Sequence, residues 1–180
     1  HALRGLDLEV RSGELTALYG PSGSGKTTLL NVIGALDTPT SGRVLIEGRD
    51  LGALTRRELS HLRRDRIGFV FQAYNLIPVL TAYENAEAVM ALQGVDASER
   101  RRRIGALFTE MGLEGLEDRR PDELSGGQQQ RVAIARAIAA DPAVVLADEP
   151  TANVDSETAE RLLGIMEKLN RDRGVTFIFS

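Results

Sequence analysis

The stretch that decides the fold of this 180-residue chain reads Gly20, Pro21, Ser22, Gly23, Ser24, Gly25, Lys26, Thr27 and Thr28. It matches the pattern G-x-x-x-x-G-K-[ST] and lies between an apolar run at Leu15–Tyr19 and a segment of helical period at Lys26–Ala35. Glycines allow the backbone N–H groups to turn inward, and the positive end of the following helix points at the same place. The stretch therefore predicts a loop that holds the phosphates of a nucleoside triphosphate, a property shared by kinases, GTPases and motor ATPases.

Two side chains of this loop have separate expected roles. Lys26 supplies a point charge to the β and γ phosphates. Thr27 offers a hydroxyl to Mg²⁺, which prefers hard oxygen ligands and keeps several waters. We therefore expect the chain to bind the nucleotide together with Mg²⁺.

Strand and helix signals alternate along the chain. Short apolar runs of the kind found in strands buried on both faces occur at Leu15–Tyr19, Ile67–Phe71, Val144–Ala147 and Val175–Phe179. Segments of helical period occur at Lys26–Ala35, Ala97–Met111, Gln128–Ala139 and Glu157–Arg173, the last with Asp155 and Ser156 as candidate caps. This order predicts an α/β fold with a mainly parallel sheet.

Two subdomains are expected beside the sheet. His1–Glu14 and Arg43–Gly48 have the pattern of short antiparallel strands, with turns at Ser12-Gly13 and Ser41-Gly42. The middle of the chain has helical period without a strand-like run, which suggests an inserted helical subdomain. We expect one domain over 1–180, with the nucleotide-binding core and β subdomain in 1–71 and 141–180 and the helical subdomain in 72–140.

Composition excludes several classes of function. The formal charge of −4, from 22 basic and 26 acidic residues, provides no basic field to attract nucleic acid. The absence of cysteine excludes disulfides and thiolate metal sites. No run of 18 apolar residues and no charged start leading into an apolar segment is present, so the sequence predicts neither a membrane span nor a secretion signal.

Polar residues follow two of the predicted strands. Asp148 and Glu149 come directly after Val144–Ala147, and Gln72 comes after Ile67–Phe71. Ligands of open α/β sheets bind beyond the carboxyl ends of the strands, where these side chains would lie. We expect Asp148 to hold Mg²⁺, Glu149 to polarise the attacking water, and the Gln72 amide to reach both the metal and that water.

A second candidate phosphate site precedes the helix at Gln128–Ala139. Leu124–Gln128 reads Leu-Ser-Gly-Gly-Gln, so Ser125, Gly127 and Gln128 add a hydroxyl and exposed N–H groups to a helix start. Taken alone, such an entry is also a common helix cap. Because the first loop already grips one set of phosphates, the economical interpretation is that this segment serves the nucleotide of a second subunit, with two chains arranged head to tail.

Leu124–Gln128 resembles the signature motif of the ABC ATPases, and the resemblance extends over nearly the whole chain in the order and spacing of that family. It assigns Gly20–Thr27 to the Walker A loop, Gln72 to the Q-loop, Val144–Glu149 to the Walker B strand and Ala152–Asp155 to the D-loop. Three stretches are similar to the subfamily of macrolide-exporter and lipoprotein-release ATPases: Gly34–Gly42, Phe69–Pro78 and Leu124–Arg131.

The resemblance implies an ATP-binding and ATP-hydrolysing subunit that powers a membrane permease. It implies ATP and Mg²⁺ as ligands, a head-to-tail homodimer, and a peripheral position on the cytoplasmic face of the cell (inner) membrane. The permease would contact the surface near Ala73–Tyr83, through candidates that core packing explains equally well: Tyr74, Leu76, Ile77 and Leu80.

The sequence departs from the family at several points. The family has a histidine that contacts the γ phosphate after the strand ending at Phe179, and an adenine-stacking aromatic residue before its first strands; neither is in this sequence. We expect His1 and His61 not to replace that histidine and Tyr19 to pack in or beside the sheet. Ala152 stands where the D-loop usually has glycine, with a strain of about 1 kcal/mol if the backbone there needs a positive φ.

These departures suggest a fragment truncated at both ends that hydrolyses ATP weakly or not at all. The main alternative function is a regulatory ABC ATPase that signals through a membrane partner without moving cargo. A DNA-repair or chromosome-organising ATPase would carry a long coiled coil, and the sequence lacks sustained heptads. A small-molecule kinase would need an acceptor site and a lid, and would not carry Leu124–Gln128.

Overall fold

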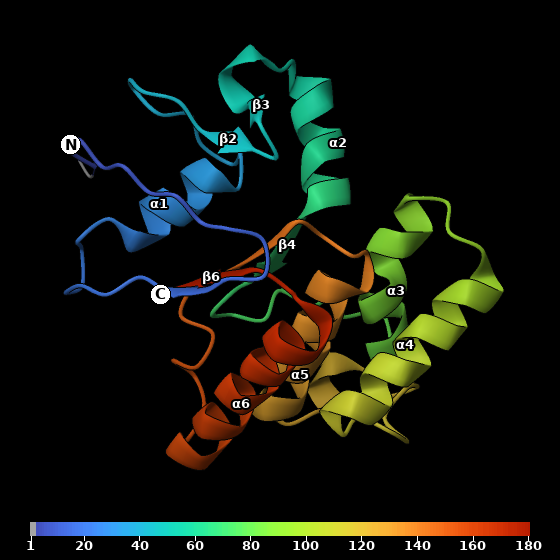
Figure 1. Cartoon of the computed structure of the whole chain (residues 1–180). Helices are drawn as coiled ribbons and strands as arrows, with labels where there is room; N and C mark the ends of the chain where they lie inside the picture. Colours follow the sequence, from blue (N-terminus) through green and yellow to red (C-terminus); the bar gives the residue numbers. More distant parts are fainter. Residues whose placement is uncertain (1–2) are drawn as a thin grey trace.

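The computed structural model describes residues 3–180 and has a four-stranded parallel sheet at its centre (Figure 1). The strands lie in the order β1-β6-β5-β4 and comprise β1 (Leu15–Ala17), β4 (Ile67–Val70), β5 (Val144–Ala147) and β6 (Phe177–Phe179). All four apolar runs that were predicted to be buried parallel strands therefore form this sheet; β5 has the predicted bounds, and each of the other three differs at one end by one or two residues.

Six α-helices and two short 3₁₀ turns connect the strands within residues 3–180. The helices are α1 (Lys26–Ile33), α2 (Arg56–Arg66), α3 (Ala82–Leu92), α4 (Ala97–Met111), α5 (Gly126–Ala139) and α6 (Ser156–Arg173). Side chains cap their starts where the sequence supplies Thr, Ser or Asp: Thr55 and Thr81 complete capping boxes with a glutamate, and Asp155 caps α6 as predicted. The helix α2 was not predicted, because most of its residues are charged or polar and only Leu62 is buried, so it lacks the apolar stripe that marks a helix in the sequence.

The sheet separates two apolar cores, because successive side chains of a strand point to opposite faces. Val145 and Ala147 of β5 face a core formed with α3, α4, α5 and α6. Val144 and Leu146 of the same strand face a smaller core that includes Leu30 of α1. The helices α1 and α5 consequently cover opposite faces of the sheet, which Figure 1 also shows.

The predicted β subdomain is smaller than expected. Its antiparallel pair consists of β2 (Leu45–Ile46) and β3 (Arg49–Asp50), joined at Glu47 and Gly48, which both have positive φ as a tight two-residue hairpin requires. The turn expected at Ser41-Gly42 is a bend that precedes this hairpin. The hairpin was misplaced because Glu47 is not one of the residues that usually mark such a turn.

The prediction of strands in His1–Glu14 was wrong for the part that the structure describes. Residues 3–14 form no strand, although the turn at Ser12-Gly13 is present; His1 and Ala2 lie outside the described residues. Leu6 and Leu8 are 53% and 44% exposed. Alternation of apolar residues produces a strand only where another strand pairs with it, and residues 3–14 pair with none of the strands formed within residues 3–180.

Strand β4 and helix α5 approach each other closely at Gly68. A Cβ atom added there would lie 2.4 Å from the carbonyl oxygen of Ala137 in α5. Gly68 therefore sets the distance between α5 and the sheet, and a larger residue would push the two layers apart.

We predict that Gly68→Ala destabilises the fold by about 1–3 kcal/mol through this overpacking. Gly105→Ala is the matched control, because Gly105 lies inside α4 with nothing within 4 Å of an added Cβ. It should instead stabilise the helix by about 0.5–1 kcal/mol. Urea unfolding of both variants tests the pair, and a Gly68→Ala protein as stable as the parent would contradict the packing argument.

Candidate nucleotide-binding site

The loop at residues 20–25 joins β1 to α1 and has the backbone geometry expected of an anion site. Gly23 and Gly25 adopt left-handed conformations, with φ of 78° and 96°, which strain any other residue. Gly25 is the N-terminal cap residue of α1, and the first turn of that helix contains no acidic residue. The unpaired N–H groups at the start of α1 and its positive end are thus available to a phosphate.

The side chain of Lys26 lies back over this loop. Its Nζ donates hydrogen bonds to the carbonyl oxygens of Gly20, at 2.9 Å, and Pro21, at 3.2 Å. Both acceptors belong to the loop itself, so the ammonium group is held against the loop that leads into α1. A cation therefore lies beside the start of a helix, the combination that binding of a polyphosphate requires.

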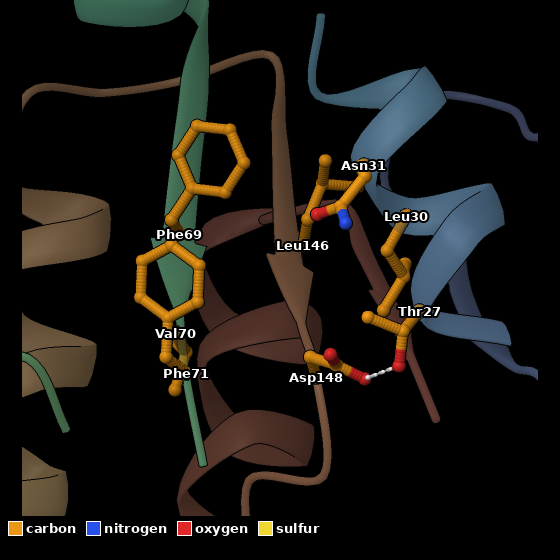
Figure 2. Close-up of a pocket in the computed structure, with 8 residues that line it drawn as sticks. All are labelled: Thr27, Leu30, Asn31, Phe69, Val70, Phe71, Leu146 and Asp148. Atoms are coloured by element: carbon orange, nitrogen blue, oxygen red, sulfur yellow. Dashed lines mark hydrogen bonds between the residues drawn. The ribbon is translucent and has the colours of Figure 1, made fainter. Parts of the chain in front are cut away.

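Thr27 and Asp148 come together from different elements at the carboxyl edge of the sheet. The Thr27 hydroxyl donates to Asp148 Oδ1 at 3.1 Å, and Figure 2 shows the two side chains pointing toward each other from α1 and from the end of β5. They line a cavity of about 150 Å³ between α1 and strands β4 and β5, into which Asn31 also points. A hydroxyl and a carboxylate oxygen in contact form a donor set of the kind that Mg²⁺ prefers.

Ser180 is a neighbour of both acidic residues that the sequence did not indicate. Its hydroxyl donates to Asp148 Oδ1 at 3.0 Å and accepts a hydrogen bond from the backbone N–H of Glu149 at 3.1 Å. Ser180 follows β6, which lies beside β5 in the sheet. The order of the strands was needed to find this contact, because the two segments are separated by 32 residues in the sequence.

Glu149 has an unusual backbone conformation. Its φ is 45°, in the left-handed region, and its side chain is exposed at the edge of the sheet. Asp148 is half-buried one residue earlier. Because non-glycine residues rarely adopt positive φ, and do so most often where the surroundings impose it, this turn is held by its neighbours.

Gln72 follows β4 and lies at the same edge of the sheet as the two acids. Its carbonyl oxygen accepts a hydrogen bond of 2.9 Å from the Asn153 side chain, and the Tyr74 hydroxyl donates to the Asn153 carbonyl at 3.4 Å. Arg136 of α5 donates to the carbonyls of Tyr74 and Asn75, two consecutive residues with positive φ. The loop after β4 is therefore attached both to the segment after β5 and to α5.

The segment Leu124–Gln128 forms the start of α5. Ser125 is its cap: the Ser125 hydroxyl accepts from the Gln128 N–H at 3.3 Å, and the Gln128 side chain accepts from the Ser125 N–H at 2.8 Å. A Cβ atom at Gly127 would lie 2.6 Å from Thr158 Cγ2 of α6, so glycine is required for this packing. The cap interpretation is confirmed.

The structure tests three expectations about individual residues. Tyr19 does not pack in or beside the sheet: its side chain is fully exposed, because β1 ends at Ala17 and residue 19 already belongs to the loop. Ala152 does not have a positive φ, so the condition for strain there is not met. His61 is exposed, which agrees with its interpretation as an ordinary surface residue.

The carboxyl group of Asp155 belongs to the same region. It accepts hydrogen bonds from the N–H of Thr158, at 2.9 Å, and from the Thr158 hydroxyl, at 2.7 Å. The hydrogen bond from the Thr158 backbone, followed by that from its hydroxyl, lowers the pKa of Asp155 below its ordinary value. The residue therefore remains ionised at the start of α6, where the helix favours a negative charge.

The fold and this site define a nucleotide-binding α/β protein with a phosphate loop, and comparison with known proteins identifies its family. Residues 3–152 match the sequence model of the ABC transporter family. The chain is 49% identical over 177 residues to the lipoprotein-releasing system ATP-binding protein LolD 1 of Rhodopseudomonas palustris, an alignment that covers 98% of this chain and 78% of the relative. It is 49% identical over 178 residues to the macrolide export ATP-binding/permease protein MacB of Syntrophobacter fumaroxidans, covering 98% of this chain and 25% of the relative.

A solved structure supports the same family assignment. The dimeric ATP-binding cassette MJ0796 of Methanocaldococcus jannaschii, bound to ADP and Pi, superposes with a TM-score of 0.88 at 46% identity and covers 99% of this chain and 78% of that one. The chain belongs to the ABC transporter family. It is the ATPase component of such a transporter, so the fold class and the class of function predicted from the sequence are confirmed.

We predict that Lys26→Met weakens ATP binding about 10- to 100-fold, because a charge-assisted hydrogen bond contributes about 1.5–3 kcal/mol. The sequence contains one other lysine, Lys168, which is exposed on α6 and provides the matched control Lys168→Met. Titration with a fluorescent ATP analogue measures both variants. Equal affinity of Lys26→Met and Lys168→Met would mean that the ammonium group of Lys26 does not contact the nucleotide.

Proposed function

We propose that two copies of this chain bind two ATP molecules between them, head to tail, and that hydrolysis of this ATP powers a membrane permease. The observation that carries the proposal is the placement of the two helix starts. The phosphate loop opens α1 on one face of the sheet, and Ser125–Gln128 opens α5 on the other. The dimeric state of the related cassette bound to ADP and Pi supports the same arrangement.

Each residue at the edge of the sheet has a proposed role toward the nucleotide of its own chain. Residues Gly20 to Thr28 would surround the phosphates, with Lys26, which already lies against this loop, as the cation. Thr27, Asp148 and Gln72 are the proposed Mg²⁺ ligands, and the direct contact between Thr27 and Asp148 fits that role. Mg²⁺ would neutralise the charge that develops on the phosphates during hydrolysis.

The chain's own groups would prepare the attacking water. Glu149 is exposed at the edge of the sheet, where its carboxylate can accept a hydrogen bond from a water molecule beside the γ phosphate. The Gln72 amide would hold that water from the neighbouring strand end. The second copy would add Ser125, Gly127 and Gln128 as donors to the same phosphate.

The permease is proposed to bind beside the loop after β4, near Ala73–Tyr83. Ile77 is 45% exposed and Val79 is 74% exposed, whereas Leu76 packs against the larger core and the Tyr74 hydroxyl bonds to Asn153, so the exposed pair are the better contact candidates. A groove of about 350 Å³ continues from this loop between α2 and α3, lined by Asn75 and the exposed Leu92 among others. Within residues 3–180, no helix is both long and apolar enough to span a membrane. The names of the relatives, ATP-binding proteins of transport systems, support the proposal of a peripheral position on the cytoplasmic face of the cell membrane.

We predict that Ser125→Ala lowers ATP turnover about 100-fold while the isolated chain still binds ATP almost as well as the parent, because the hydroxyl serves the nucleotide of the other copy. Loss of the helix cap alone would cost about 1 kcal/mol of stability. Thr55→Ala removes an equivalent capping box at α2 and should leave turnover unchanged. Weaker ATP binding by monomeric Ser125→Ala would show instead that the segment serves its own nucleotide.

A further inference from the structure

Gln130 is a buried polar side chain whose position the proposed chemistry does not explain. It lies in α5, two residues after Gln128, and has 0% exposure. Its Nε2 donates a hydrogen bond of 2.6 Å to the carbonyl oxygen of Pro150, and its Oε1 has no partner within residues 3–180. An unpaired buried acceptor opposes folding, so an apolar side chain of similar length would suit this position better if packing were its only task. What the Gln130 amide adds over an apolar side chain is therefore the hydrogen bond that it donates to the Pro150 carbonyl.

That hydrogen bond holds a turn with an unfavourable conformation. Pro150 directly follows Glu149, whose φ is 45°. Positive φ is unfavourable for a glutamate, and a residue before proline is restricted to extended conformations. The surroundings must therefore impose the turn: Ser180 accepts from the Glu149 N–H, the Glu149 carbonyl accepts from the Ala152 N–H, and Gln130 holds the Pro150 carbonyl from the side of α5.

The start of α5 is packed closely against the loop after β4 and against α6. A Cβ atom at Gly126 would lie 2.8 Å from the Tyr74 hydroxyl, and one at Gly127 would lie 2.6 Å from Thr158. Neither contact allows α5 to move without moving its neighbours. Because Gln130 of α5 bonds to the Pro150 carbonyl, a movement of α5 would displace Pro150, the residue next to Glu149.

We propose that Gln130 is a positioning residue that holds the Glu149 carboxylate in place through the Pro150 carbonyl. Because Gln130 and Ser125–Gln128 belong to the same helix, it also couples that carboxylate to the nucleotide bound at Ser125–Gln128. The inference rests on the proposed function, in which Ser125–Gln128 contacts the nucleotide of the second copy while Glu149 acts on the chain's own. Engagement of one nucleotide by α5 would then align the group that hydrolyses the other.

Two substitutions separate this role from simple packing. Gln130→Met keeps the length of the side chain and removes the donor, and we expect it to lower kcat about tenfold or more, since a small displacement of a catalytic group has a large effect on rate. The affinity for a fluorescent ATP analogue should stay within about twofold, because no phosphate contact is changed. Gln93→Met is the matched control: the Gln93 amide also donates to a backbone carbonyl, that of Arg64, far along the chain from the site.

Gln130→Glu adds a second test, the pH dependence of kcat, which would not change if Gln130 only filled space. Burial raises the pKa of a carboxyl group, and only the protonated form can donate to the Pro150 carbonyl. The ratio of kcat between Gln130→Glu and the parent should therefore rise as the pH falls from about 8 to about 6. Circular dichroism at both pH values confirms that the compared proteins are folded.

Each outcome is decisive. Parent-like kcat in Gln130→Met, a decrease no larger than that of Gln93→Met, or a pH-independent ratio for Gln130→Glu would overturn the inference. The proposed function itself is checked by Glu149→Gln in the same assay. If that variant loses turnover while Gln130→Met retains it, only the role of Gln130 is wrong; if the parent has no turnover or Glu149→Gln retains it, both proposals are wrong.

Discussion

The parallel direction of all four strands in the main sheet is the constraint on which the rest of the structure depends. Their carboxyl ends lie at one edge, so the segments that follow them meet there whatever their separation in the sequence. The phosphate loop follows β1, Asp148 and Glu149 follow β5, Gln72 follows β4 and Ser180 follows β6. The contacts of Thr27 and Ser180 with Asp148 are direct consequences of this arrangement.

The two candidate phosphate-binding segments begin helices that pack on opposite faces of the sheet, so one chain does not bring them together. The helix α1, which begins at the phosphate loop, packs on one face, and α5, which begins at Ser125, packs on the other. Two candidate phosphate-binding helix starts on opposite faces are readily explained if each serves a different nucleotide. In a symmetric dimer each surface occurs twice. A head-to-tail pair of this chain would therefore form two equivalent sites, each with the phosphate loop of one copy and Ser125–Gln128 of the other.

Much of this architecture was predictable because it depends on local signals. The apolar runs, the glycines of the phosphate loop and the cap at Asp155 each carry their information within a few residues. What the sequence could not reveal depends on tertiary contacts: the partner that residues 3–14 lack, the exposure of Tyr19, and the hydrogen bonds of Gln130 and Asn153 to residues 20 and 81 positions away. Such contacts follow from the order of the strands, and no local pattern encodes that order.

The most direct test of the composite site mixes two inactive variants. In a head-to-tail pair of one Lys26→Met chain with one Ser125→Ala chain, one site contains both defects and the other contains an intact phosphate loop and an intact Ser125. The account predicts that mixing the two proteins restores ATP turnover that neither shows alone. A mixture as inactive as each separate variant would contradict it, because each chain would then depend on its own Ser125.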